Sequence, residues 1–232
     1  MENSNPKPAN ISPWEAILVI VVTFFVFLFL GAIILLTVGE GPTLIFGELL
    51  ILIVPLVYLL YRRIPVKTFV RFNLNPKYIL IGLACGGLLL LLNFAVSGVL
   101  VAIFGVSQAV QQANDTIVQL SASPSGLAEV AISLALAGIC EEFAFRGFLQ
   151  NSIFQSLSAK KGTQYAFIVA VVIAAGVFGI FHFDPQIVYT LSAFITGLAL
   201  GFIYHHFNYT TSAMAHASMN LMVLALLIFI GA

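Results

Sequence analysis

The stretch LAEVAISLALAGICEEFAFRGFLQNSIF, residues 127–154, decides how this chain folds, because it is apolar and yet carries charge at its centre. Glu141 and Glu142 are adjacent, and Arg146 follows four residues after Glu142. A charged side chain at the centre of a bilayer costs about 2.5–3.5 kcal/mol on insertion scales. Three ionisable groups so close together therefore indicate a functional centre. The structural alternative is that both glutamates line a polar contact between helices.

The composition is that of a membrane protein. Of the 232 residues, 61% are hydrophobic and 8% are charged, whereas soluble domains average about 45–50% apolar and about 25% charged residues. The formal net charge is zero, so the charge balance indicates no nucleic-acid partner. We expect membrane lipids as partners, and the composition leaves the oligomeric state open.

Seven segments are long and apolar enough to cross a bilayer, which takes about 20 residues per helix. We predict an all-α fold, a polytopic membrane helical bundle with about seven transmembrane helices and a range of six to eight. The composition does not shift along the chain, so we expect a tail over residues 1–12 and a single membrane domain over residues 13–232. The predicted spans are 13–38, 43–61, 78–104, 127–154, 164–181, 186–204 and 212–230.

Lysine and arginine gather in loops that would share one side of the membrane. Short loops rich in these residues stay in the cytoplasm, and the segment 62–77 contains five of them. Lys160 and Lys161 follow the fourth span, and Lys7 precedes the first. Alternation of seven spans puts all three segments on the same side. We therefore predict a cytoplasmic N-terminus and, for a prokaryotic cell, location in the plasma membrane.

Helix geometry separates the two glutamates. Side chains four residues apart share a face of a helix, whereas neighbours are rotated by about 100°. Glu142 is therefore placed to form an ion pair with Arg146, and Glu141 has no partner within its own helix. A free carboxylate in an apolar setting is suited to general acid or base chemistry. Cys140 is not expected to be a nucleophile, because the adjacent carboxylates disfavour a thiolate.

Three polar residues on later spans are candidates to act with Glu141. His182 follows Phe178 by one helical turn, which would set the phenyl ring beside the imidazole. His216 and Asn220 are four residues apart among small residues, so both project to one side. Structural alternatives stay open, namely an interfacial histidine for His182 and an interhelical hydrogen-bonded pair for the other two.

Four further polar residues carry weaker signals. His205 and His206 end the sixth predicted span, where we interpret them as interfacial. Glu48 and Asn93 lie within the second and third predicted spans, where each either contacts the site or satisfies a neighbouring polar group.

The polar residues fall into three ordered motifs, EExxxR at 141–146, FxxxH at 178–182 and HxxxN at 216–220. In this order they resemble the CPBP family of CAAX prenyl endopeptidases and bacteriocin-processing enzymes, also called the Abi family. The resemblance covers residues 125–230, the expected catalytic core. It implies an intramembrane endopeptidase that cuts a membrane-associated or CAAX-like protein or peptide substrate.

The resemblance also implies roles for individual residues. Glu141 resembles the general base that activates water, with His182 assisting it. His216 and Asn220 resemble the pair that stabilises the oxyanion. Glu142, Arg146 and Phe178 resemble supports of the site.

The cofactor and two rival functions stay open at this stage. Zinc is possible, with Glu141, His182 and His216 as its ligands, and a metal-free glutamate mechanism is the alternative. Buried glutamate and histidine also build proton relays, so a proton- or ion-coupled transporter is a rival function. The other rival is an inactive family member that acts in bacteriocin immunity or partner binding.

One geometric difficulty follows from the predicted topology. A full span separates His182 from His216, and a rise of 1.5 Å per residue sets them roughly 20 Å apart along the membrane normal. A shared site would then require tilted helices, a break near Pro185 or displaced helix ends.

Overall fold

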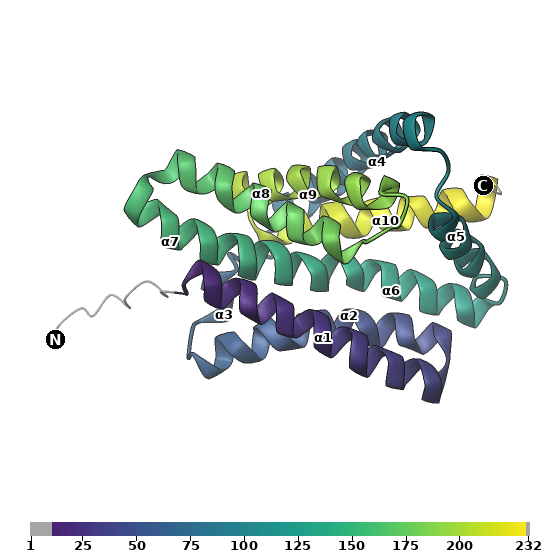
Figure 1. The fold of residues 1–232 in the computed structure, drawn as a ribbon, viewed down its shortest axis with the longest axis horizontal. Helices are drawn as coiled ribbons and strands as arrows, with labels where there is room; N and C mark the ends of the chain where they lie inside the picture. Colours follow the sequence, from purple (N-terminus) through teal and green to yellow (C-terminus); the bar gives the residue numbers. More distant parts are fainter. Residues whose placement is uncertain (1–10, 231–232) are drawn as a thin grey trace.

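The structure is a computed structural model and describes residues 11–230, so most of the expected tail lies outside the described residues. Every regular element in the described range is a helix (Figure 1). This confirms the all-α fold. In chain order the elements are α1 Pro13–Val38, α2 Glu40–Tyr61, α3 Val66–Phe69, α4 Pro76–Phe104, α5 Gln108–Leu120, α6 Pro124–Glu142, the π-helix η1 Phe143–Gln150, α7 Asn151–Lys161, α8 Thr163–Phe181, α9 Val188–His206 and α10 Tyr209–Ile230.

Six helices of the described chain are long and apolar enough to cross a membrane, namely α1, α2, α4, α8, α9 and α10. They correspond to six of the seven predicted spans. The remaining predicted span, 127–154, begins in α6. This helix carries three glutamates and is not among the six. The polytopic helical bundle is confirmed, and the six helices lie within the predicted range.

The helical segment that contains the fourth predicted span, 127–154, extends beyond it at both ends. Helices α6, η1 and α7 follow one another without a break from Pro124 to Lys161. The polar residues near its predicted end stay helical because they are buried and bonded: Asn151 Nδ2 donates to Phe69 O at 2.7 Å and Ser152 Oγ donates to Phe148 O at 2.7 Å. A hydropathy pattern does not reveal hydrogen-bond partners of this kind.

Local signals set the helix starts. Ser12 and Glu15 form a capping box, in which Ser12 Oγ accepts from Glu15 N and Glu15 Oε2 accepts from Ser12 N, and Pro13 occupies the first turn. Helix α5 starts with a single capping bond, in which Ser107 Oγ accepts from Val110 N at 3.3 Å. Helices α3 and α5 were not predicted, because both are too polar or too short to register as spans.

Helix α6 lies at the centre of the bundle. It packs against α2 on one side and α10 on the other, while α8 and α9 pack against η1 (Figure 1). Small residues permit the closest approach, since a Cβ added to Gly138 of α6 would collide with the backbone of Ala217 in α10. This contact fixes the register of the two helices that carry the EExxxR and HxxxN motifs.

Candidate active site

The EExxxR motif spans the junction of α6 and η1. Glu141 and Glu142 end α6, and Arg146 lies in the middle of η1. All eight residues of η1 are buried. Short π-helical segments inside α-helices are frequent at functional sites, because the extra residue per turn re-aims the side chains.

Glu142 holds two partners on a single oxygen. Arg146 Nη1 lies 2.7 Å from Glu142 Oε1, which is the ion pair expected from the four-residue spacing. His216 Nδ1 lies 3.1 Å from the same oxygen. Glu142 and Arg146 are fully buried and His216 is 4% exposed. The second contact was not expected, and it joins α10 to the α6–η1 junction.

Arg146 is enclosed on two further sides. Its Nη2 donates to Gly197 O of α9 at 3.2 Å, and its guanidinium lies 4.4 Å from the centroid of the Phe178 ring. A Cβ on Gly197 would come within 3.3 Å of Nη2. The glycine therefore lets the arginine reach the α9 backbone. Sequence reasoning missed Gly197, and no local signal marks it.

Glu141 meets the other nitrogen of His216. Its Oε2 lies 3.8 Å from His216 Nε2, and its exposed fraction is 8%. A carboxylate can only accept, so the bond to Glu142 puts a proton on His216 Nδ1. Nε2 is then the nitrogen that faces Glu141. The two glutamates are thus distinguished, with Glu142 bonded tightly and Glu141 held loosely.

His182 caps the end of α8. Its Nδ1 lies 2.9 Å from Phe178 O, and because a carbonyl only accepts, Nδ1 carries the proton. Nε2 is therefore the ring nitrogen available to bind or accept a proton. The imidazole centroid lies 4.4 Å from the Phe178 ring and 5.2 Å from the Tyr189 ring. Phe178 walls His182 as the spacing predicted.

The expected separation of the two histidines is wrong. The Phe178 ring centroid lies 4.4 Å from that of His182 and 5.8 Å from that of His216, so the two imidazoles cannot be roughly 20 Å apart. Helix α10 starts at Tyr209, so His216 lies seven residues, or about 10 Å, along this helix and back toward the depth of His182. The His182 side chain also leans back toward Phe178, as helical side chains do.

Asn220 lies farther from the glutamates. Its Nδ2 donates to Leu134 O of α6 at 3.3 Å. Leu134 precedes Glu141 by seven residues, which corresponds to about 10 Å along the helix. Within residues 11–230, no hydrogen bond joins Asn220 or His182 to Glu141. The structure thus brings His216 to both glutamates, whereas Asn220 contacts α6 at Leu134, farther along the α6–α10 interface.

Glu48 and Asn93, two of the weaker candidates, have different surroundings. Glu48 of α2 has an Oε2 atom that is buried without a hydrogen-bond partner in the described structure, and its carboxyl group lies near that of Glu141. Asn93 of α4 instead donates to Ser192 Oγ at 3.3 Å. Glu48 therefore belongs to the surroundings of the site, whereas Asn93 forms a hydrogen bond to a neighbouring helix, α9.

The expected zinc ligands do not form a ligand set as they stand. In the part of the chain that the structure describes, no three His, Cys, Asp or Glu side chains gather closely enough to hold a metal ion. His216 faces a glutamate with each ring nitrogen, and the Phe178 ring contacts both imidazoles.

Residues 123–222 match the family model of the type II CAAX prenyl endopeptidases, described as Rce1-like. This match covers 100 of the 232 residues and agrees with the resemblance of the three motifs to the CPBP family. The match spans all three motifs and runs from the start of α6 into α10, while α1 to α5 lie outside it. No curated protein and no solved structure matches the chain. The match indicates a CAAX-type intramembrane endopeptidase.

Proposed function

We propose that this protein hydrolyses a peptide bond of a membrane-associated or CAAX-like protein or peptide, using a water molecule activated by Glu141. The observation that carries the proposal is the difference in bonding between the two glutamates. Glu142 is committed to Arg146 and His216, whereas Glu141 is only loosely held at 3.8 Å from His216 Nε2. A general base must be free to take a proton, and Glu141 is the carboxylate that meets this condition.

The residues around Glu141 supply the other functions that hydrolysis requires. The oxygen of the water molecule attacks the carbonyl carbon while Glu141 takes a proton from that water. His182 Nε2 assists by accepting a hydrogen bond from the same water. His216 donates from Nε2 to the developing oxyanion when both of its ring nitrogens are protonated. The carbon–nitrogen bond then breaks, and Glu141 returns its proton to the leaving amine.

The charges of this cluster balance in that state. Glu141 and Glu142 contribute two negative charges, and Arg146 and protonated His216 contribute two positive charges. Paired charges are far less costly than single ones within a membrane. Balance at the start of the reaction is therefore consistent with a site buried among apolar helices.

Asn220 supports the site through position. Because its amide donates to Leu134 O, it helps to hold α10 against α6 and so keeps His216 beside the glutamates. The role of Asn220 in oxyanion stabilisation rests on the family resemblance, and it would require the amide to leave Leu134.

We propose a glutamate-type mechanism, because Glu141, His182 and His216 do not gather into a metal-binding group in the described residues, and His216 faces a glutamate with each ring nitrogen. The measurement that decides is metal analysis of active, purified protein together with treatment by a chelator. Activity that survives removal of bound metal supports the glutamate mechanism. Activity that is lost with the metal and restored by zinc overturns it.

Substitution of His216 tests the proposed chemistry. In proteoliposomes with a membrane-anchored peptide substrate, His216→Ala should lower kcat by about 10²–10³, the usual effect of removing an oxyanion donor. His206→Ala is the control, since His206 is exposed at the end of α9. Undiminished cleavage by His216→Ala would contradict the assignment. Ion flux that depends on Glu141 without hydrolysis would instead support a transporter.

A further inference from the structure

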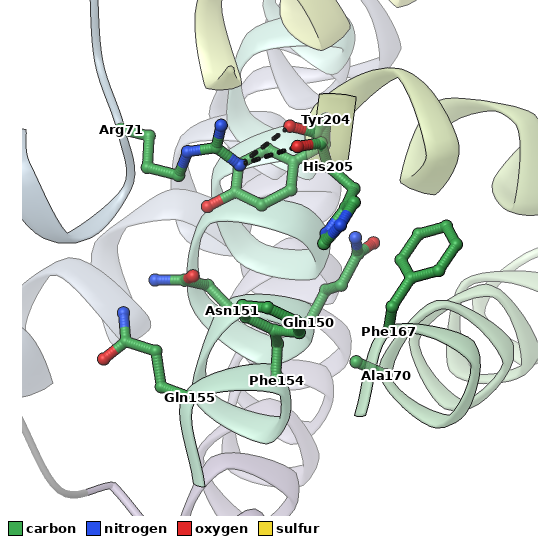
Figure 2. Close-up of a pocket in the computed structure, with 9 residues that line it drawn as sticks. All are labelled: Arg71, Gln150, Asn151, Phe154, Gln155, Phe167, Ala170, Tyr204 and His205. Atoms are coloured by element: carbon green, nitrogen blue, oxygen red, sulfur yellow. Dashed lines mark hydrogen bonds between the residues drawn. The ribbon is translucent and has the colours of Figure 1, made fainter. Parts of the chain in front are cut away.

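A pocket lies at the far end of η1 from the glutamates. It encloses about 370 Å³ and is lined by Arg71, Gln150, Asn151, Phe154 and Tyr204, among others (Figure 2). We call it the α7–α9 pocket, and none of its lining residues belongs to the three motifs. Ligand pockets in proteins commonly enclose about 300–1,000 Å³, so the volume suits a small polar group.

Two buried polar atoms of these lining residues have no hydrogen-bond partner in residues 11–230, Gln150 Oε1 and Tyr204 Oη. Each residue is only 2% exposed. The Gln150 amide is held in one orientation because its Nε2 donates to Gly201 O at 2.9 Å. Oε1 is therefore an acceptor in need of a donor. Polar atoms buried in this way are almost always satisfied in native proteins.

Arg71 provides a cation at the edge of the same pocket. Its Nη1 donates to Tyr204 O and His205 O at 3.1 Å, and its Nη2 donates to Phe207 O at 2.7 Å. These three bonds fix the guanidinium over the Tyr204 ring, 5.3 Å from its centroid (Figure 2). Within the described range, Nε of Arg71 makes no hydrogen bond. The Nε edge is thus available to an anion.

The pocket lies at the basic end of the bundle. Apart from Arg146, every lysine and arginine of residues 11–230 lies in segment 62–77 or at positions 160 and 161. Segment 62–77 contributes Arg71 to the pocket, and α7, which ends at Lys161, contributes Asn151 and Phe154. Basic residues next to membrane spans attract anionic lipids. Charge and position therefore favour an amphipathic anion over a free metabolite.

We propose that the α7–α9 pocket binds the headgroup of an anionic phospholipid, a phosphodiester that carries hydroxyl groups. The phosphate binds the Nε edge of Arg71. A headgroup hydroxyl donates to Gln150 Oε1, and another headgroup oxygen accepts from Tyr204 Oη. The same chemistry is present in soluble glycerol phosphates, so the test separates the two sources. This proposal is independent of the proposed hydrolysis.

The test uses the purified full-length chain in a neutral maltoside detergent. Phosphatidylglycerol, phosphatidylcholine and glycerol 3-phosphate are added separately, and bound ligand is measured by native mass spectrometry and by the shift in Tm. Choline has no hydrogen-bond donor for Gln150 Oε1 and carries a positive charge toward Arg71. Phosphatidylglycerol should therefore bind about tenfold or more tightly than phosphatidylcholine, and glycerol 3-phosphate should not reproduce its shift in Tm.

Two pocket variants and one control variant keep the result interpretable. Tyr204→Phe removes only the unpartnered hydroxyl and should weaken phosphatidylglycerol binding about fivefold. Arg71→Gln should weaken it about tenfold or more. Lys160→Gln removes a cation at the same end but outside the pocket, and should weaken binding much less than Arg71→Gln does.

Three results would overturn the proposal. The first is equal binding of the two phospholipids. The second is phosphatidylglycerol binding that neither Tyr204→Phe nor Arg71→Gln alters. The third is a shift in Tm from glycerol 3-phosphate that matches that of the lipid, which would assign the pocket to a soluble anion.

Discussion

At the scale of single residues, the site depends on a cluster of charged side chains that are almost completely buried. Glu142 Oε1 binds both Arg146 and His216, while Glu142 Oε2 is buried without a hydrogen-bond partner in the described chain. Removing one member of such a cluster leaves its partners buried and uncompensated. The cluster is therefore sensitive to any change of charge, even a change that keeps the shape of the side chain.

Glu142→Gln should lower the free energy of unfolding by about 3–5 kcal/mol, because it leaves the Arg146 charge unpaired. Thermal unfolding of the purified protein in detergent checks this. Glu129→Gln on the same helix is the matched control, since Glu129 is only half-buried. Replacing the pair together, as Glu142→Leu with Arg146→Met, should recover much of the loss. A variant Glu142→Gln as stable as Glu129→Gln would show that the ion pair contributes nothing.

At the scale of helices, the site is held by the contact between α6 and α10. Three contacts follow one another in antiparallel register, His216 on Glu142, Ala217 on Gly138 and Asn220 on Leu134. Small residues set this register, because only they let the two backbones approach closely. A displacement of α10 would separate His216 from both glutamates.

Gly138→Ala should therefore destabilise the protein by about 1–3 kcal/mol, since the added methyl group meets backbone rather than a movable side chain. Gly176→Ala in α8 is the control, because nothing lies within 4 Å of a Cβ there. That substitution should be neutral or should stabilise the helix by up to about 1 kcal/mol. The comparison of Tm between the two variants is the measurement. Equal effects would contradict the packing argument.

Local and distant contacts differ in how far the sequence reveals them. The Glu142–Arg146 pair and the place of Phe178 beside His182 depend on spacing within one helix, so they were predictable. The Glu142–His216 contact joins residues 74 positions apart and depends on the α6–α10 register. The continuation of α6 through η1 into α7 depends on tertiary partners of Asn151 and Ser152. Neither is visible in a hydropathy pattern.

At the scale of the whole molecule, the distribution of charge sets the expected orientation in the membrane. Lys and Arg concentrate in segment 62–77 and at the end of α7, whereas Asp115 lies in α5 on the opposite, acidic side of the predicted topology. From the positive-inside rule we expect the basic end, with the α7–α9 pocket, to face the cytoplasm.

Reporter fusions test this orientation. An alkaline phosphatase fused after residue 161 should be inactive, and one fused after residue 115 should be active, because the enzyme folds only outside the cytoplasm. The reverse pattern would place the N-terminus outside and would remove the pocket from the cytoplasmic leaflet.

The central claim concerns one carboxylate, and its most direct test is the cleavage rate of Glu141→Gln. This variant keeps the shape of the side chain and removes the base. With a membrane-anchored peptide substrate, kcat should fall by about 10²–10⁴, the usual contribution of general base catalysis, while Tm stays near that of the unmodified protein. Glu129→Gln should retain full activity. A folded Glu141→Gln variant that cleaves at the unmodified rate would contradict the account.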